Sequence, residues 1–203
     1  MLRIALALTL LIGALPCGHA AGAAAASAAD TVSRFHEDLV ETMNKAPSLA
    51  CEARMAKLAP AVDRAFDLRF IAERVLRRHW KDLNDGQRGQ FTAALRRSVL
   101  TTYVTEFSSP GSVRFSTGTS ESLANGDSLV HATLSPAKAA PVTLDYQLKR
   151  RGEQWQVVNV IAEGVSDLAL RATQYDGLMK EAGFDGLLSR LDSQTQQLRK
   201  RCP

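Results

Sequence analysis

Few side chains in this 203-residue chain have the types and spacing that catalysis or metal binding requires. The segment HEDLV, residues 36–40, begins like the zinc-binding pattern H-E-x-x-H, in which two histidines one helical turn apart hold the metal. Val40 stands where the second histidine would be, so we expect no zinc site and place His36 on the surface. We place His79 at the amphipathic end of a helix and His131 on the outer face of a strand.

Other catalytic patterns are absent as well. The chain contains no G-x-S-x-G, no Walker loop and no G-x-G-x-x-G. Its candidate acids are scattered along the chain, and no two of them form a pair: Asp127, Asp145, Glu163 and Asp167. The sequence therefore predicts a protein that is not an enzyme, with no catalytic residue, no metal and no cofactor.

The first 20 residues have the features of a secretory signal peptide. Arg3 gives a positive start, a short apolar run follows, and small residues precede Ala21 at a cleavage site. We predict a signal peptide over residues 1–20, a disordered lead-in over 21–30 and one domain over 31–203. No later stretch reaches the about 18 apolar residues of a membrane span, so we expect a soluble periplasmic protein.

Export places the two cysteines beyond the leader, Cys51 and Cys202, in an oxidising compartment. Two such cysteines most often pair, and the chain has no C-x-x-C redox motif. We therefore predict a structural disulfide between Cys51 and Cys202, which would tie the end of the chain to an early helix.

The charge of the chain is mildly positive, with a formal net charge of +4 at pH 7. Its basic clusters, such as Lys149-Arg150-Arg151, lie among acidic residues and are typical of solvated helix and hairpin faces. Together with the export signal, this pattern argues against nucleic acid as a partner. We expect a monomer.

The spacing of apolar residues is helical from Thr31 to about Phe107. Four helical segments are expected in this part of the chain, over about residues 31–43, 49–66, 67–80 and 85–107. Pro60 should kink or divide the second of them. Asp67 is the expected cap of the third, and Asn84 with Gln87 resembles a capping box at the start of the fourth.

After residue 110 the apolar period changes to two, which indicates strands. Four strands joined by short turns predict an antiparallel meander. Helices resume with Ser166 as N-cap, and Gly183 separates the last two. The expected fold is α+β, a four-stranded twisted antiparallel sheet covered by about six to seven helices.

The fourth strand differs from the other three. In WQVVNVIAEGVS, residues 155–166, apolar side chains occupy both faces, whereas a strand with one solvated face would alternate. Two arrangements explain the excess: an apolar cavity for a small molecule between sheet and helices, or a sheet with helices packed on both sides. The pattern alone leaves both open.

Three longer segments carry a resemblance: RVLRRHWKDLNDGQRGQFTAALRRSVLTTY, VTLDYQLKRRGEQWQVVNVIAEGVS and GFDGLLSRL. They resemble the periplasmic phospholipid-binding proteins of the maintenance-of-lipid-asymmetry pathway, also called the toluene-tolerance family, from about Phe66 to Leu191. The resemblance implies an apolar cavity between sheet and helices that encloses lipid tails. It also implies two partners, an inner-membrane ABC transporter complex and an outer-membrane lipoprotein complex, between which phospholipid is carried.

The resemblance places Tyr103 and Val165 against the lipid tails. From the apolar pattern we add six further lipid-binding candidates, Val75, Leu100, Phe107, Val142, Leu144 and Tyr146. Two positions depart from the family pattern, which often has Gly where this chain has Arg77 and Asp where it has Asn159.

Two alternatives to phospholipid transport remain at this point. FDLRFIAERVL and LALRATQYDGLMKEAGFDGL also resemble the hopanoid-associated members of the family, which would make the protein a hopanoid carrier working with an RND-type exporter. The other alternative is a non-lipid adaptor with a filled core that binds another envelope protein through its basic faces.

Overall fold

The computed structural model describes residues 26–202 of the chain. The predicted signal peptide, residues 1–20, lies outside the described residues, as does the first half of the predicted lead-in. The elements in chain order are α1 (Ala28–Asn44), the 3₁₀ turn η1 (Ala46–Ser48), α2 (Cys51–Ala65), α3 (Leu68–Leu76), α4 (His79–Asp82), α5 (Asp85–Glu106), β1 (Val113–Ser122), β2 (Ser128–Pro136), β3 (Val142–Arg151), β4 (Gln154–Ala162), β5 (Val165–Ser166) and α6 (Asp167–Lys200).

The predicted α+β fold with an antiparallel meander is confirmed. The strands lie in the order β1-β2-β3-β4-β5, each antiparallel to its neighbour. The sheet has five strands rather than four, because the chain after β4 turns back and pairs two residues, Val165 and Ser166, with the end of that strand.

Side-chain caps set the starts of four helices. Asp67, Asn84 and Ser166 cap α3, α5 and α6 as expected, and the capping box of Asn84 is complete. The start of α1 differs from the prediction. Ser27 forms a second capping box with Asp30, so the helix begins at Ala28 and includes residues that we had assigned to the lead-in.

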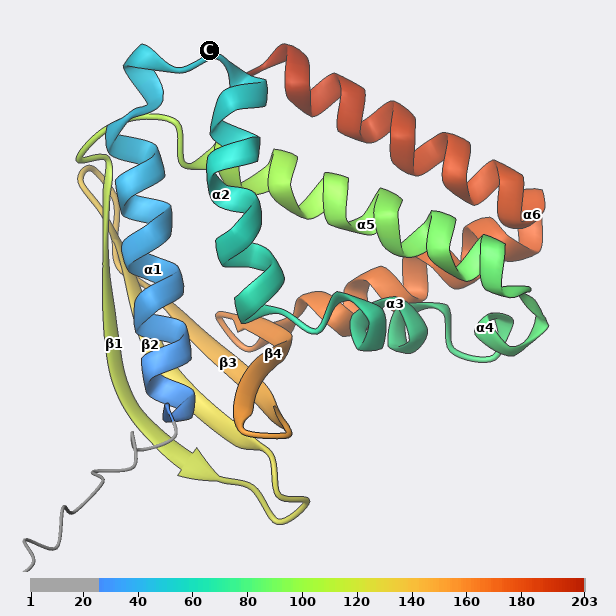
Figure 1. Cartoon of the computed structure of the whole chain (residues 1–203), viewed down its shortest axis with the longest axis horizontal. Coiled ribbons are helices and arrows are strands. Elements are labelled where there is room, and N and C mark those ends of the chain that lie inside the picture. Colours follow the sequence, from blue (N-terminus) through green and yellow to red (C-terminus); the bar gives the residue numbers. More distant parts are fainter. Residues whose placement is uncertain (1–25, 203) are drawn as a thin grey trace, which may run out of the picture.

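Pro60 and Gly183 act differently on their helices. α2 continues through Pro60 to Ala65, so the proline does not divide it. α6 is interrupted at Gly183, whose φ of 66° and ψ of −167° are not helical and are readily adopted only by glycine. The expected division between the last two helices is therefore present, and Figure 1 shows the two halves of α6 running in different directions.

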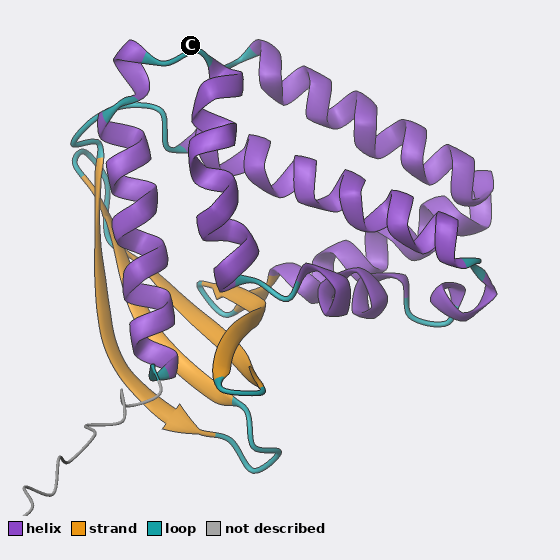
Figure 2. Ribbon diagram, in the orientation of Figure 1, coloured by secondary structure: helices purple, strands orange, loops and turns teal. Residues whose placement is uncertain are grey.

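The helices gather on one side of the sheet (Figure 2). α1 lies along the sheet, whereas α5 and the second half of α6 extend away from it (Figure 1). One core cluster joins α1, α2 and part of α5 to the inner face of the sheet. A second cluster lies among α3, α4, α5 and α6.

A β-bulge explains the two apolar faces of the fourth strand. The pairing between β3 and β4 passes from Leu148 opposite Val157 to Gln147 opposite Asn159, so Val158 is an extra residue. A bulge bends its strand and re-aims the side chains that follow. From the bulge onward, Val158, Asn159, Val160 and Ala162 share a pocket wall with residues of α3 and α6.

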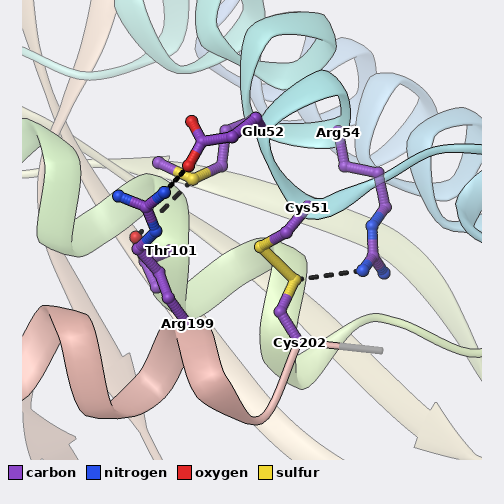
Figure 3. The surroundings of a disulfide bond; sticks show 7 residues. Cys51, Glu52, Arg54, Thr101, Arg199 and Cys202 are labelled. Carbon is purple, nitrogen blue, oxygen red and sulfur yellow. Dashed lines mark hydrogen bonds and ion pairs between the residues drawn. A yellow bond between two sulfur atoms is a disulfide. The ribbon is translucent and has the colours of Figure 1, made fainter.

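The disulfide between Cys51 and Cys202 is present, as predicted (Figure 3). It joins the start of α2 to the chain just after α6 across a sequence separation of 151 residues, with the Cα atoms 5.9 Å apart. In the chain-entropy account, closing a loop of this length stabilises the fold by about 5 kcal/mol. The bridge therefore ties the second half of α6 to the helix that packs against the sheet.

Candidate functional site

His36 is buried, so our prediction of a surface position is wrong. Only 4% of it is exposed, and its ring nitrogens lie 2.9 Å from the Tyr146 hydroxyl and 3.2 Å from Thr117 Oγ1. Burial lowers the pKa of His36 to about 4, so the ring is neutral at neutral pH. Its position one helical turn after Val32 on the apolar stripe of α1 was the signal for burial.

The other two histidines form pairs with carboxylates, and the His79 pair is partly buried. His79 Nε2 lies 2.9 Å from Asp176, and His131 Nδ1 lies 2.7 Å from Asp145 on the neighbouring strand. Across residues 26–202, no three His, Cys, Asp or Glu side chains gather as a metal site would require. The three histidines His36, His79 and His131 therefore do not lie together in one site.

The candidate site is an apolar cavity of about 310 Å³. It lies between α3, α5, β4 and the first half of α6, and twelve of the seventeen residues that line it are apolar or aromatic. These are Phe66, Leu68, Ile71, Leu95, Val99, Tyr103, Phe107, Val157, Val158, Val160, Ala162 and Leu168. An apolar wall of this kind suits a hydrocarbon ligand.

Four of the five polar residues of the cavity wall lie on α5 and α6. Thr102 and Glu106 come from successive turns of α5, and Asp167 and Arg171 from successive turns of α6. The Arg171 guanidinium bonds the Asp167 carboxylate at 2.7 Å. Burial acts to lower the pKa of Arg171, but Asp167 and Tyr175 outweigh it, so the pKa lies above its ordinary value and the cation is permanent.

Asn159 fastens the start of α6 to β4 beside the cavity. Its side-chain oxygen accepts hydrogen bonds from Ser166 Oγ at 3.0 Å and from the Leu168 backbone N–H at 3.3 Å. The asparagine thus fills, as a neutral acceptor, a position where the family often has an aspartate. It fixes the distance between two of the cavity's walls.

An aromatic cluster borders the cavity on the side of α1. Tyr103 stacks on Phe107 and meets Phe35 edge to face, with ring centroids 6.1 and 5.1 Å apart respectively. Phe66 contacts Phe35 in the same way at 5.0 Å. Burial raises the pKa of Tyr103, so its hydroxyl stays protonated. These rings separate the cavity from the packed layer under α1.

The structure distributes the predicted lipid-binding residues unevenly. Tyr103 and Phe107 line the cavity. Leu100, Leu144 and Tyr146 are buried in the core beside it, and Val142 packs at the edge of that core. Val75 is buried in the second cluster, and Val165 is 59% exposed. For all of these residues, contact with a lipid stays a prediction.

Most of the wall was missed by the apolar pattern. The helical spacing on α5 favoured Leu100, but the neighbouring stripe of Val99 and Thr102 faces the cavity. Val158 and Val160 belong to the strand with two apolar faces, which was the one signal that pointed to this wall.

A tight turn accounts for the sequence EGVS at the end of β4. Glu163 and Gly164 connect the paired residues Ala162 and Val165, and both have positive φ values of 49° and 77°. Such values at the two central residues are the mark of a type I′ hairpin turn. A Cβ at Gly164 would meet nothing within 4 Å, so the turn, and not a close approach, requires this glycine.

Within residues 26–202, no helix is both long enough and apolar enough to cross a membrane. A family model described as MlaC protein matches residues 33–193. A solved structure of the phospholipid-binding protein from Ralstonia solanacearum in complex with a phospholipid is similar in fold, with a TM-score of 0.71 at 23% identity, covering 85% of this chain and 99% of that one. The family match spans most of the chain, and the fold agrees with it, so this protein belongs to the MlaC protein family.

Proposed function

We propose that this protein is a phospholipid carrier that encloses acyl tails in the cavity between α3, α5, β4 and α6. The observation that carries the proposal is the cavity of about 310 Å³ with a mostly apolar wall and one polar edge. The family membership and the phospholipid bound by the protein from Ralstonia solanacearum support it. Carriage needs binding and release, and no catalytic residue.

The physical requirement is enclosure of the tails. Each methylene left in water costs about 0.8 kcal/mol, so two tails amount to on the order of 20 kcal/mol before offsets. An open groove would leave part of that cost in place. A walled cavity removes it, and for the same reason the lipid leaves slowly unless a partner opens the wall.

The cavity must widen to take two tails, because its volume lies near the low end of the about 300–1,000 Å³ of ligand pockets. The aromatic border of Tyr103 and Phe107 is the part of the wall best suited to move, since ring rotation would join the cavity to the space beside α1. Tyr103 and Phe107 would then contact the tails along their length.

The polar edge is suited to the head group. Arg171 is a permanent cation on the cavity wall and could meet a lipid phosphate. Val165 is an exposed residue of β5, just after the turn and beyond the wall, so it would contact the lipid only where the tails emerge toward the head group. This placement is compatible with the role that the family resemblance gives it.

We propose that transport runs through the periplasm between the inner and outer membranes. The predicted export signal and the family support this setting. The partners would be an inner-membrane ABC transporter complex and an outer-membrane lipoprotein complex, and slow spontaneous release explains why both are needed. We propose phospholipid, and not hopanoid, as the cargo.

Mass spectrometry of the organic extract from protein purified from the periplasm tests the proposal. We expect about one equivalent of a two-tailed phospholipid, and delipidated protein should take lipid up from labelled vesicles. A hopanoid in the extract would identify the cargo as hopanoid in place of phospholipid. No extractable lipid and no uptake would reject the carrier and favour the adaptor.

Substitutions in the wall test the cavity itself. Val160→Trp places a larger apolar ring in the cavity, so we expect a folded protein that has lost its lipid. Val160→Glu should do the same, since a carboxylate facing the cavity can be hydrated there but opposes hydrocarbon. Ala139→Glu, in the exposed loop between β2 and β3, is the charge-matched control. Lipid retained at wild-type levels by both Val160 variants would place the tails elsewhere.

A further inference from the structure

A basic depression lies next to the cavity, on the other side of the start of α6. Its volume is about 570 Å³, and it is lined by Arg74, Arg77, Arg78 and Lys81 from the α3–α4 region. The opposite wall is the segment from Ser166 to Ala172. Leu168 belongs to the walls of both the depression and the cavity, so the two are separated by little more than one side chain.

The positive charge of this depression is only partly compensated. Arg78 bonds Asp176 at 2.8 Å, and Glu73 lies in the same wall. The Arg74 guanidinium lies 5.9 Å from the centre of the Phe70 ring, a contact that leaves its charge uncancelled. Four cations against these two carboxylates leave an electropositive surface that suits phosphate groups.

Two exposed apolar side chains stand on the same stretch of chain. Val165 and Leu170 are 59% and 51% exposed, and they are the large hydrophobic residues most exposed to solvent within residues 26–202. Val165 precedes Ser166, the first residue of the segment that walls the basic depression, and Leu170 lies between its lining residues Ala169 and Ala172. Exposed aliphatic tips beside clustered cations are the pattern of proteins that bind the surface of an anionic membrane.

Arg77 adds a backbone observation. It has φ 51° and ψ −124°, a conformation that glycine adopts at little cost and other residues rarely adopt. A strained backbone persists where the surrounding structure or a function demands it. Here glycine would adopt the backbone conformation with less strain, but the chain has an arginine, which places a long cationic side chain in the wall of the depression.

We propose that the basic depression, with Val165 and Leu170, is a docking surface for a membrane that contains anionic phospholipid. The arginines and Lys81 would bind head-group phosphates while the two aliphatic side chains enter the interface. Docking would hold the neighbouring cavity at the membrane surface, a consequence that rests on the proposed function. The surface itself binds membranes whether or not the cavity carries lipid.

Vesicle flotation with the purified protein tests the docking surface. We expect binding to vesicles of phosphatidylglycerol and phosphatidylethanolamine, weaker binding as salt is raised, and little binding to pure phosphatidylcholine. Equal binding to both vesicles, or none to either, would overturn the proposal. Salt-sensitive binding to an isolated acidic envelope protein in place of the vesicles would also overturn it.

Substitution of Arg77 separates binding from folding. Arg77→Gly relieves the strained backbone, so its melting temperature should equal or exceed that of the wild type, while vesicle binding falls about fivefold per lost cation. Arg114→Gln removes one exposed cation from β1, far from the depression, and should bind like the wild type. Leu170→Ser should weaken binding by roughly tenfold. Equal loss in the Arg77 and Arg114 variants would show a net-charge effect and reject the site.

The lipid content of the wild-type protein distinguishes the two proposals. A protein that carries lipid but does not bind anionic vesicles would refute the docking surface alone. A protein that binds the vesicles in the predicted way but carries no lipid would refute the carrier alone.

Discussion

The two neighbouring strands β3 and β4 belong to one sheet but face different interiors. On β3 the inward residues Leu144, Tyr146 and Leu148 are all buried in a packed layer. On β4 five residues line a cavity: Val157, Val158, Asn159, Val160 and Ala162. The sequence separates the two strands only in part: β3 alternates apolar and polar side chains and β4 is apolar on both faces, but neither pattern tells a packed layer from a cavity wall.

The helix over each strand makes the difference. α1 lies along the sheet, and its His36 and Phe35 interlock with Tyr146 and the aromatic rings around it. α3, α5 and α6 surround β4 without lying along it, and the bulge at Val158 turns the strand toward them. Asn159 then holds α6 at a set distance from β4. A packed core therefore forms where a helix lies along the strands of the sheet. A cavity forms where the helices surround a strand without lying along it.

Removal of the disulfide should have the largest effect and should act unequally on the two regions. We expect Cys51→Ser with Cys202→Ser to lower the free energy of unfolding by about 4–5 kcal/mol. Hydrogen exchange should rise in the second half of α6 more than in β3, while the protein still holds lipid. Non-reducing mass analysis after alkylation first checks the bond itself. An equal rise of hydrogen exchange in the second half of α6 and in β3 would contradict the distinction between the two regions.

A pair of truncations compares the two strands directly. Leu148→Ala in the packed layer should cost about 3 kcal/mol, because a new void opens around a side chain with no exposure. Val160→Ala in the cavity wall should cost less than about 1 kcal/mol, since it enlarges an existing space. Denaturant unfolding measures both. Similar costs at the two positions would mean that the cavity wall is packed as tightly as the core.

The packed layer should also show a pH dependence of stability, through the buried His36. The pKa of His36 falls from its ordinary 6.5 to about 4 in the folded protein because the ring is buried. Between pH 6.5 and 4 the unfolded chain binds a proton that the folded protein does not, so stability falls as pH falls, by up to about 3 kcal/mol. His36→Gln should flatten the stability profile in this window, as measured by urea unfolding. An unchanged slope would assign the pH dependence to other groups.

Val165→Glu should have the smallest effect on stability, within about 0.5 kcal/mol, because the side chain is 59% exposed. If the family resemblance places Val165 correctly against the emerging tails, the folded mutant will lose lipid. Circular dichroism and lipid extraction measure the two properties. A mutant that keeps its lipid would show that Val165 does not contact the lipid tails and belongs only to the outer surface.

Much of the fold was accessible from local patterns. The caps at Asp67, Asn84 and Ser166, the meander and the division at Gly183 were predicted because each depends on residues adjacent in sequence. The prediction of a disulfide followed from cysteine count and compartment. The errors lie where tertiary contacts decide, as for His36, whose ring faces a strand about 110 residues away.

The cavity was predictable in kind but not in its residues. The two apolar faces of residues 155–166 indicated surplus apolar surface, and the family resemblance indicated a ligand to cover it. Of the eight proposed contacts, only Tyr103 and Phe107 lie in the wall. Apolar periodicity identifies side chains that avoid water, but a packed core and a cavity wall satisfy that condition equally well.

The sequence by itself determined the order of helices and strands, the caps of three helices and the family that the chain resembles, because these depend on neighbouring residues and on composition. Only the tertiary structure decided which apolar face packs into a core and which face lines a cavity. That choice depends on the bulge at Val158, the anchor at Asn159 and the directions in which α1, α5 and α6 run relative to the sheet. The bulge and the anchor are contacts across short turns, and the helix directions depend on segments distant in sequence; none of them leaves a trace in the apolar periodicity.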